Sequence, residues 1–126
     1  MAKVSLFFCL VICFSKEVEK LDCESYYDLL NRVDQYIILD TRLKDQYNFE
    51  RIPSAYWAGD KETLDSIVKK LSLQTNIFIY CDYGDRTVEV YEILRDNYGF
   101  ENIYDLDKGF EEWKYQNYPV DTLLIE

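Results

Sequence analysis

Runs of apolar residues alternate with amphipathic segments along most of the chain. Continuous apolar residues fill 36–39 and 77–80, which is typical of strands that are buried on both faces of a sheet. Apolar side chains at helical spacing predict helices that begin after Asp22, after Asp60 and at Thr87. Shorter segments are predicted to form a helical turn at 44–49, strands at 55–58 and 102–106, and a helix at 109–116. This alternation predicts an α/β fold with a mostly parallel sheet.

The N-terminal segment has a pattern of its own. An apolar run at 4–14 follows Lys3 and gives way to the polar pair Lys16-Glu17, which is the layout of a short secretory signal peptide. The run is too short for a transmembrane helix. We therefore expect residues 1–15 to be a signal peptide and 16–126 to form one domain of an exported protein, periplasmic or secreted. Two alternatives stay open: a lipoprotein modified at Cys13, or a buried first element of a cytoplasmic protein.

Composition restricts the chemistry of the chain. The formal net charge of −10 argues against nucleic acids and anionic membranes as partners. We expect the protein to be a monomer. The chain contains no histidine, which excludes Cys-His and Ser-His dyads and removes the commonest metal ligand. We therefore expect no cofactor and no metal, and any reactive cysteine must be activated by backbone dipoles and arginine. A disulfide between Cys23 and Cys81 is the less favoured alternative, because the two lie in different local contexts.

Cys81 stands at the junction between a predicted strand and a predicted helix. It follows the apolar run at 77–80, and the helix begins at Thr87. Backbone N–H groups of such a loop, together with the start of the helix, favour a thiolate, which is the nucleophilic form of cysteine. Asp40 ends the other buried strand, and the carboxyl ends of parallel strands meet at one edge of the sheet. We therefore expect Asp40 and Cys81 to share a site; the alternative is that Cys81 is an inert buried cysteine.

Four segments, in order and at matching spacing, resemble a rhodanese-like domain. They are 38–42 (ILDTR), 47–55 (YNFERIPSA), 81–87 (CDYGDRT) and 99–113 (GFENIYDLDKGFEEW). The resemblance implies a central, mostly parallel five-stranded sheet flanked by helices. It also implies a sulfurtransferase that takes a sulfane sulfur from thiosulfate or a persulfide. Cys81 would carry that sulfur as a persulfide and pass it to a thiol or to cyanide.

The same resemblance assigns roles to further residues. The loop residues expected around the sulfur are Asp82, Tyr83, Gly84, Asp85, Arg86 and Thr87. Gly84 is expected at positive φ, and Arg86 is expected to bond loop carbonyls or to pair with Asp40. Asp40 and Arg42 would support the loop. The segment 81–86 is one residue shorter than the corresponding loop of the phosphatases, which argues against a phosphatase or an arsenate reductase.

Several residues depart from the family pattern. Asp82 and Asp85 would place two carboxylates inside the cradle, where they disfavour a thiolate and repel anionic thiosulfate. Lys108 replaces a glycine and would partly offset these charges if it lies near the loop. The acids also favour an alternative function, a non-catalytic rhodanese fold used for binding or redox sensing. The aromatic residues Trp57 and Trp113 are expected in the core.

Overall fold

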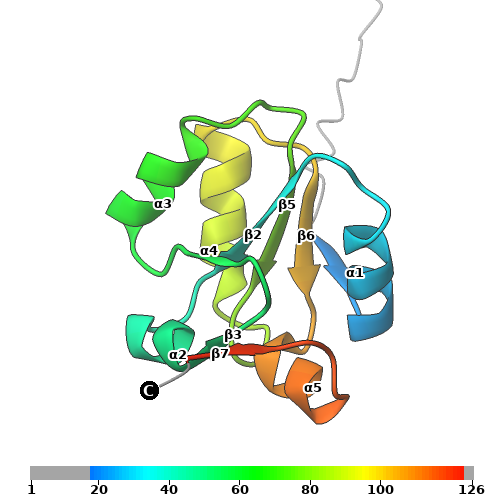
Figure 1. Cartoon of the computed structure of the whole chain (residues 1–126). Helices are drawn as coiled ribbons and strands as arrows, with labels where there is room; N and C mark the ends of the chain where they lie inside the picture. Colours follow the sequence, from blue (N-terminus) through cyan, green and yellow to red (C-terminus); the bar gives the residue numbers. More distant parts are fainter. Residues whose placement is uncertain (1–17, 124–126) are drawn as a thin grey trace, which may run out of the picture.

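A five-stranded sheet forms the centre of the structure, a computed structural model that describes residues 18–123 (Figure 1). Its strands, in spatial order, are β1 (Glu19–Leu21), β6 (Ile103–Leu106), β5 (Asn76–Tyr80), β2 (Tyr36–Asp40) and β4 (Tyr56–Trp57). Every neighbouring pair in this sheet is parallel. The predicted α/β fold with a mostly parallel five-stranded sheet is therefore confirmed.

Helices cover both faces of the sheet. One face packs against α1 (Cys23–Leu30) and α5 (Gly109–Tyr115), and the other packs against α3 (Lys61–Val68) and α4 (Thr87–Glu92). On the central strand β5, Phe78 and Tyr80 belong to the first core, while Ile77 and Ile79 belong to the second. Burial on both faces explains why this strand is continuously apolar in the sequence.

Helix starts follow the predicted caps. Asp22 accepts the N–H of Ser25 at 2.8 Å, and Asp60 accepts the N–H of Thr63 at 2.7 Å. The helix predicted from Thr87 onward begins there, but its second half is the π-helix η1 (Ile93–Asn97). The predicted helical turn at 44–49 is α2 (Lys44–Phe49), which lies near the carboxyl edge of the sheet (Figure 1).

Two features of the sheet architecture were not predicted. The edge strand β1 is short and polar, with the sequence EKL, so it lacks the apolar run that marks a buried strand. The strands β3 (Glu50–Arg51) and β7 (Asp121–Thr122) form a separate antiparallel pair of two residues each. Such short ladders carry no periodic signal.

The expected signal peptide at residues 1–15 lies outside the described residues, so it stays a prediction. Between residues 18 and 123, no helix is both long and apolar enough to cross a membrane.

Candidate active site

Cys81 directly follows β5, at the carboxyl edge of the sheet. Its neighbour Tyr80 pairs in register with Asp40 at the end of β2, so the cysteine and the aspartate lie at the same edge, as expected. The Cys81 side chain is fully buried. Its sulfur accepts the N–H of Gly84 at 3.1 Å, and its thiol donates to Asp85 Oδ1 at 3.9 Å. Of the loop amides expected to point at the sulfur, Gly84 is the one that hydrogen-bonds to it in the described part of the chain.

The first residues of α5 hydrogen-bond to the backbone of the loop at 81–86. The N–H of Phe110 donates to the carbonyl of Cys81 at 2.8 Å, and the N–H of Glu111 donates to that of Asp82 at 3.1 Å. Gly84 has the expected positive φ, 89°, and a Cβ at this position would lie 1.8 Å from the carbonyl oxygen of Asp107. The loop therefore requires glycine both for its φ and for its closeness to the neighbouring backbone.

The loop carboxylates Asp82 and Asp85 lie in different surroundings. Asp85 contacts the sulfur, whereas Asp82 accepts a hydrogen bond from Gln46 Nε2 at 2.8 Å. The other oxygen of Asp82 lies 3.8 Å from Nη1 of Arg42. The prediction that both carboxylates face the sulfur is thus wrong for Asp82, because the buried Arg42 cation and Gln46 hold it.

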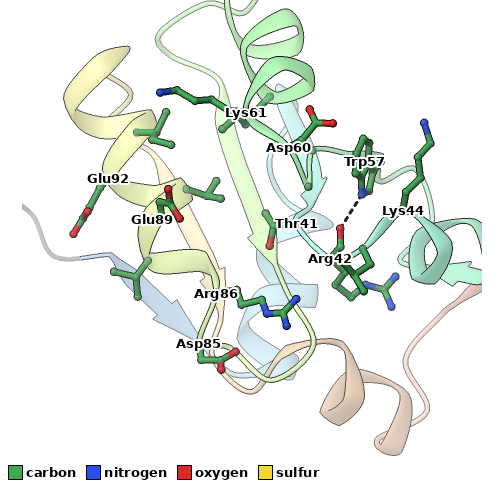
Figure 2. Close-up of a pocket in the computed structure, with 17 residues that line it drawn as sticks. Thr41, Arg42, Lys44, Trp57, Asp60, Lys61, Asp85, Arg86, Glu89 and Glu92 are labelled. Atoms are coloured by element: carbon green, nitrogen blue, oxygen red, sulfur yellow. Dashed lines mark hydrogen bonds between the residues drawn. The ribbon is translucent and has the colours of Figure 1, made fainter.

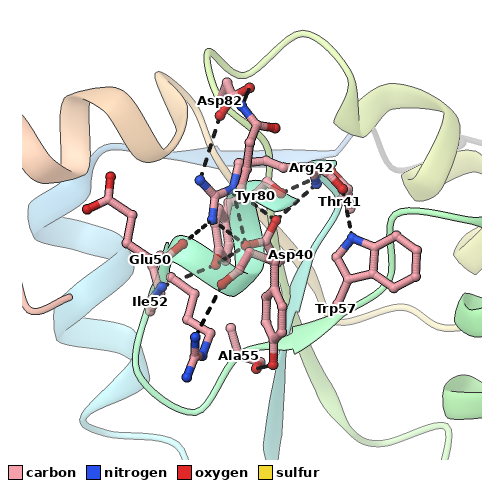
Figure 3. A network of polar contacts seen from close by, with 12 residues as sticks. Asp40, Thr41, Arg42, Glu50, Ile52, Ala55, Trp57, Tyr80 and Asp82 are labelled. Carbon is pink, nitrogen blue, oxygen red and sulfur yellow. Dashed lines mark hydrogen bonds and ion pairs between the residues drawn. The ribbon is translucent and has the colours of Figure 1, made fainter. Parts of the chain in front are cut away.

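A buried polar network lies beside the loop (Figure 3). Arg42 donates to Asp40 from Nε at 3.0 Å and from Nη2 at 2.7 Å, and Tyr80 donates its hydroxyl to the same carboxylate at 2.6 Å. Nη2 of Arg42 also donates to the carbonyl of Glu50 at 2.6 Å, and the guanidinium lies 4.1 Å from the centre of the Phe110 ring. Arg42 therefore joins β2, the start of β3 and α5.

Electrostatics within this network favour one arrangement of protons. Burial lowers the pKa of Arg42, but the hydrogen bonds and charge of Asp40 outweigh it and raise the pKa overall. Burial and the Asp40 charge raise the pKa of Tyr80, so the phenol keeps its proton and donates it. Arg42 is thus a cation held on a carboxylate that also accepts the tyrosine hydroxyl.

Of the two contacts considered for Arg86, with loop carbonyls or with Asp40, the pairing with Asp40 does not occur. Arg42 occupies the carboxylate, since it is two residues away on the same strand end and is itself buried. Arg86 is exposed and forms the N-cap position of α4. Its side chain extends from the start of α4 into a pocket beside the loop (Figure 2).

That pocket has a volume of about 600 Å³ and lies between α3, α4 and the end of β2. Trp57 lines it, donates its indole N–H to the Arg42 carbonyl at 2.8 Å, and stacks with Lys44 at 4.9 Å from the ring centre. The prediction that Trp57 belongs to the core is therefore wrong, because the indole reaches a strand-end carbonyl instead. Trp113, by contrast, is a core residue as predicted.

Asp105 is a residue of the site region that the sequence did not single out. It lies on β6 and accepts the hydroxyl of Thr87 at 2.6 Å, and both residues are fully buried. Its second oxygen is buried and has no hydrogen-bond partner within residues 18–123. Burial raises the pKa of Asp105 to about 6. The sequence does place an acidic residue at an inward-facing position of the predicted strand 102–106, and this pattern could have identified Asp105 as a buried acid.

The remaining predicted residues are placed as follows. Tyr83 is exposed, Lys108 is exposed at the N-cap of α5, and Cys23 is a buried free thiol at the start of α1. Cys81 is also a free thiol, so these two cysteines form no disulfide. Within the described range, no cluster of three or more potential metal ligands occurs.

Comparison with known sequences covers most of the chain. Residues 22–116 match the family described as Rhodanese-like domain. The chain is 28% identical to thiosulfate sulfurtransferase GlpE of Coxiella burnetii over 99 residues, which are 79% of this chain and 87% of that protein. It is 25% identical to adenylyltransferase and sulfurtransferase UBA4 of Debaryomyces hansenii over 103 residues. That match covers 75% of this chain and 23% of UBA4, so the chain spans about a quarter of that relative.

Solved structures show the same fold. The Alr3790 protein from Anabaena sp. superposes with a TM-score of 0.72 at 24% identity, covering 82% of this chain and 81% of that one. A rhodanese-related protein from Thermoplasma volcanium superposes with a TM-score of 0.67 at 23% identity, covering 82% of this chain and 97% of that one.

Proposed function

Because the chain belongs to the rhodanese-like domain family, we propose that it is a sulfurtransferase. It moves a sulfane sulfur through a persulfide on Cys81 to a thiol or to cyanide. The observation that carries the proposal is the hydrogen bond from the Gly84 N–H to the Cys81 sulfur, 3.1 Å long, at the carboxyl end of a central strand. A fixed backbone donor stabilises negative charge on sulfur, whether on a thiolate or on the sulfur of a persulfide.

The transfer proceeds in two displacements at sulfur. The Cys81 thiolate attacks the outer sulfur of the donor, and the donor's S–S bond breaks with its electron pair on the leaving group. The acceptor then attacks the outer sulfur of the Cys81 persulfide, and the electron pair of that S–S bond returns to Cys81. The loop from Cys81 to Arg86 is short, which suits a single additional sulfur atom better than a phosphate group.

Asp40 and Arg42 support sulfur transfer by holding the cysteine loop in place. Their ion pair is buried, and Arg42 also lies 3.8 Å from the Asp82 carboxylate of the loop. These contacts support a role in holding the loop against β2 and α5. Neither residue forms a hydrogen bond with the Cys81 sulfur within the described chain.

The charges around the sulfur bear on the choice of donor. Asp85 lies in contact with the Cys81 thiol, and a carboxylate there repels dianionic thiosulfate more strongly than a persulfide of lower charge. The pocket beside the loop is lined by cationic side chains, among them Arg86 and Lys61, and also by the acids Asp60, Asp85, Glu89 and Glu92. We therefore propose that a persulfide is a better donor than thiosulfate, and that donor and acceptor approach from the side of the loop where Asp85 lines this pocket (Figure 2).

A second function is supported by one observation. The Cys81 side chain has no exposed surface, and its thiol is hydrogen-bonded to a carboxylate. Both features also suit a non-catalytic member of the family that binds a partner or senses oxidants.

Thiocyanate release separates the two functions. The protein is incubated with a sulfane donor and cyanide, and thiocyanate is measured for the wild type and for Cys81→Ser. The sulfurtransferase produces thiocyanate in proportion to enzyme and loses this activity in Cys81→Ser. Equal background release by both proteins, with thiosulfate and with an alkyl persulfide, would favour the binding or sensing function.

A further inference from the structure

Among residues 18–123, the buried sulfur of Cys81 has one ionisable side chain, Asp85, in hydrogen-bond contact. The thiol donates to Asp85 Oδ1 at 3.9 Å, and in the described chain the other hydrogen bond to the sulfur comes from the Gly84 N–H. Cys81 itself has no exposed surface, whereas Asp85 is exposed and lines the pocket beside the loop. Asp85 is therefore placed between a buried thiol and the solvent.

From this contact we propose that Asp85 is a catalytic residue, the group that takes the proton of the Cys81 thiol and returns it to the leaving group. The inference rests on the proposed sulfur transfer and names its acid–base residue. A carboxylate in this position acts as a general base first and as a general acid afterwards.

The step balances without any further reactant. The Cys81 thiol proton passes to the Asp85 carboxylate, and the sulfur's electron pair forms a bond to the outer sulfur of an alkyl persulfide. The S–S bond of the donor breaks, its electron pair goes to the alkyl thiolate, and Asp85 gives the proton to that thiolate. A thiol and a persulfide are consumed, a thiol and a persulfide are formed, and no net oxidation occurs.

Other groups near the loop are committed elsewhere. Asp82 is held by Gln46 at 2.8 Å, and Asp40 accepts from Arg42 and Tyr80. The chain contains no histidine that could act as the general base for the Cys81 thiol. Of the loop's acids, Asp85 is the one hydrogen-bonded to the sulfur.

The nature of the leaving group gives the proposal a distinctive consequence. An alkyl thiolate is a basic leaving group that gains from a proton, whereas sulfite leaves thiosulfate as a stable anion and gains little. Asp85 therefore helps the reaction with a persulfide and, through its charge, hinders the reaction with thiosulfate. Loss of the carboxylate changes the two rates in opposite directions.

The test measures single-turnover formation of the Cys81 persulfide by intact mass, with the persulfide of N-acetylcysteine and with thiosulfate as donors. For Asp85→Asn, the rate with the persulfide is expected to fall by about 100-fold or more. The rate with thiosulfate is expected to rise severalfold. Asp85→Glu, which keeps a carboxylate, is expected to recover part of the persulfide rate.

Asp82→Asn is the matched control, because it removes the same charge from the same loop without touching the sulfur. The ratio of the two donor rates is expected to change by less than about threefold, since the Asp82 carboxylate accepts from Gln46 and does not contact the sulfur.

A rise of both rates in Asp85→Asn would overturn the proposal, because Asp85 would then act by charge alone. An equal fall of both rates would overturn it as well, since that outcome indicates a damaged loop. Failure of the proposed function is distinguishable from either result, because the wild type would then gain no sulfur on Cys81 from any donor.

Discussion

Arg42 and Asp40 form a buried, two-pronged ion pair at the end of β2, with nitrogen–oxygen distances of 3.0 Å and 2.7 Å. The pair is supported by the Tyr80 hydroxyl on one side and by the Phe110 ring on the other. Because Arg42 also reaches the Glu50 carbonyl and approaches Asp82, it connects the sheet to the cysteine loop.

Removal of Arg42 is expected to destabilise the protein strongly. Arg42→Met leaves the Asp40 carboxylate buried without its cation, which typically costs about 3–5 kcal/mol. Arg42→Lys keeps a positive charge but cannot form two parallel hydrogen bonds to the Asp40 carboxylate. We therefore expect its free energy of unfolding to lie between those of the wild type and Arg42→Met. Urea unfolding of the three proteins measures these differences. A loss below about 1 kcal/mol for Arg42→Met would contradict the account.

Gly84 and Gly99 provide a matched pair of glycines. Both have positive φ, 89° and 83°, but a Cβ at Gly84 would clash with the Asp107 carbonyl, while no atom of residues 18–123 lies within 4 Å of a Cβ at Gly99. Gly99→Ala should therefore show only the backbone strain, about 1–2 kcal/mol. Gly84→Ala should cost more and should also lower the rate of persulfide formation, because the loop must move. Equal losses of stability for the two variants, with unchanged sulfur transfer, would show that the close approach is unimportant.

Asp105 is expected to make stability depend on pH. Because burial raises its pKa to about 6 in the folded protein, the folded state holds this proton more tightly than the unfolded state does. The stabilisation that protonated Asp105 gives the folded state is fully present below the pKa of an unfolded aspartate. It is lost as the pH rises to about 6, which lowers the free energy of unfolding by up to about 3 kcal/mol.

Asp105→Asn removes this ionisation while keeping a side chain that can accept from Thr87. The difference in unfolding free energy between the wild type and Asp105→Asn should shift in favour of the variant between about pH 4 and pH 7. Chemical denaturation at several pH values gives this difference. A difference that stays constant over that range would mean that Asp105 titrates as an exposed carboxyl does.

The central sheet could be predicted because its strands carry a strong signal. Residues 36–39 and 77–80 are apolar without interruption, and the helix caps Asp22 and Asp60 mark the following helices. The short polar strand β1 and the ladder of β3 with β7 gave no such signal, since their pairing depends on segments far away in the sequence.

Placement of Cys81 and Asp40 at one edge of the sheet also followed from the sequence, because parallel strands align their ends. The side chains that pair with Asp40 and with the loop acids could not be predicted from the sequence. The sequence does not show whether Arg42 or Arg86 pairs with Asp40. Only the folded chain shows that Arg42 is buried against Asp40 while Arg86 lines the pocket. In the same way, only the folded chain shows that Asp82 lies beside Gln46 and Arg42 whereas Asp85 contacts the sulfur.

The proposal that Cys81 carries sulfur is tested most directly by mass. The full-length protein is purified without reductant, treated with the persulfide of N-acetylcysteine, and analysed as intact protein and as peptides. We predict a gain of about 32 Da, one sulfur atom, on the peptide that contains Cys81, and its loss on addition of cyanide. The same gain should persist in Cys23→Ser and vanish in Cys81→Ser. An unmodified Cys81 with persulfide and with thiosulfate alike would contradict the account.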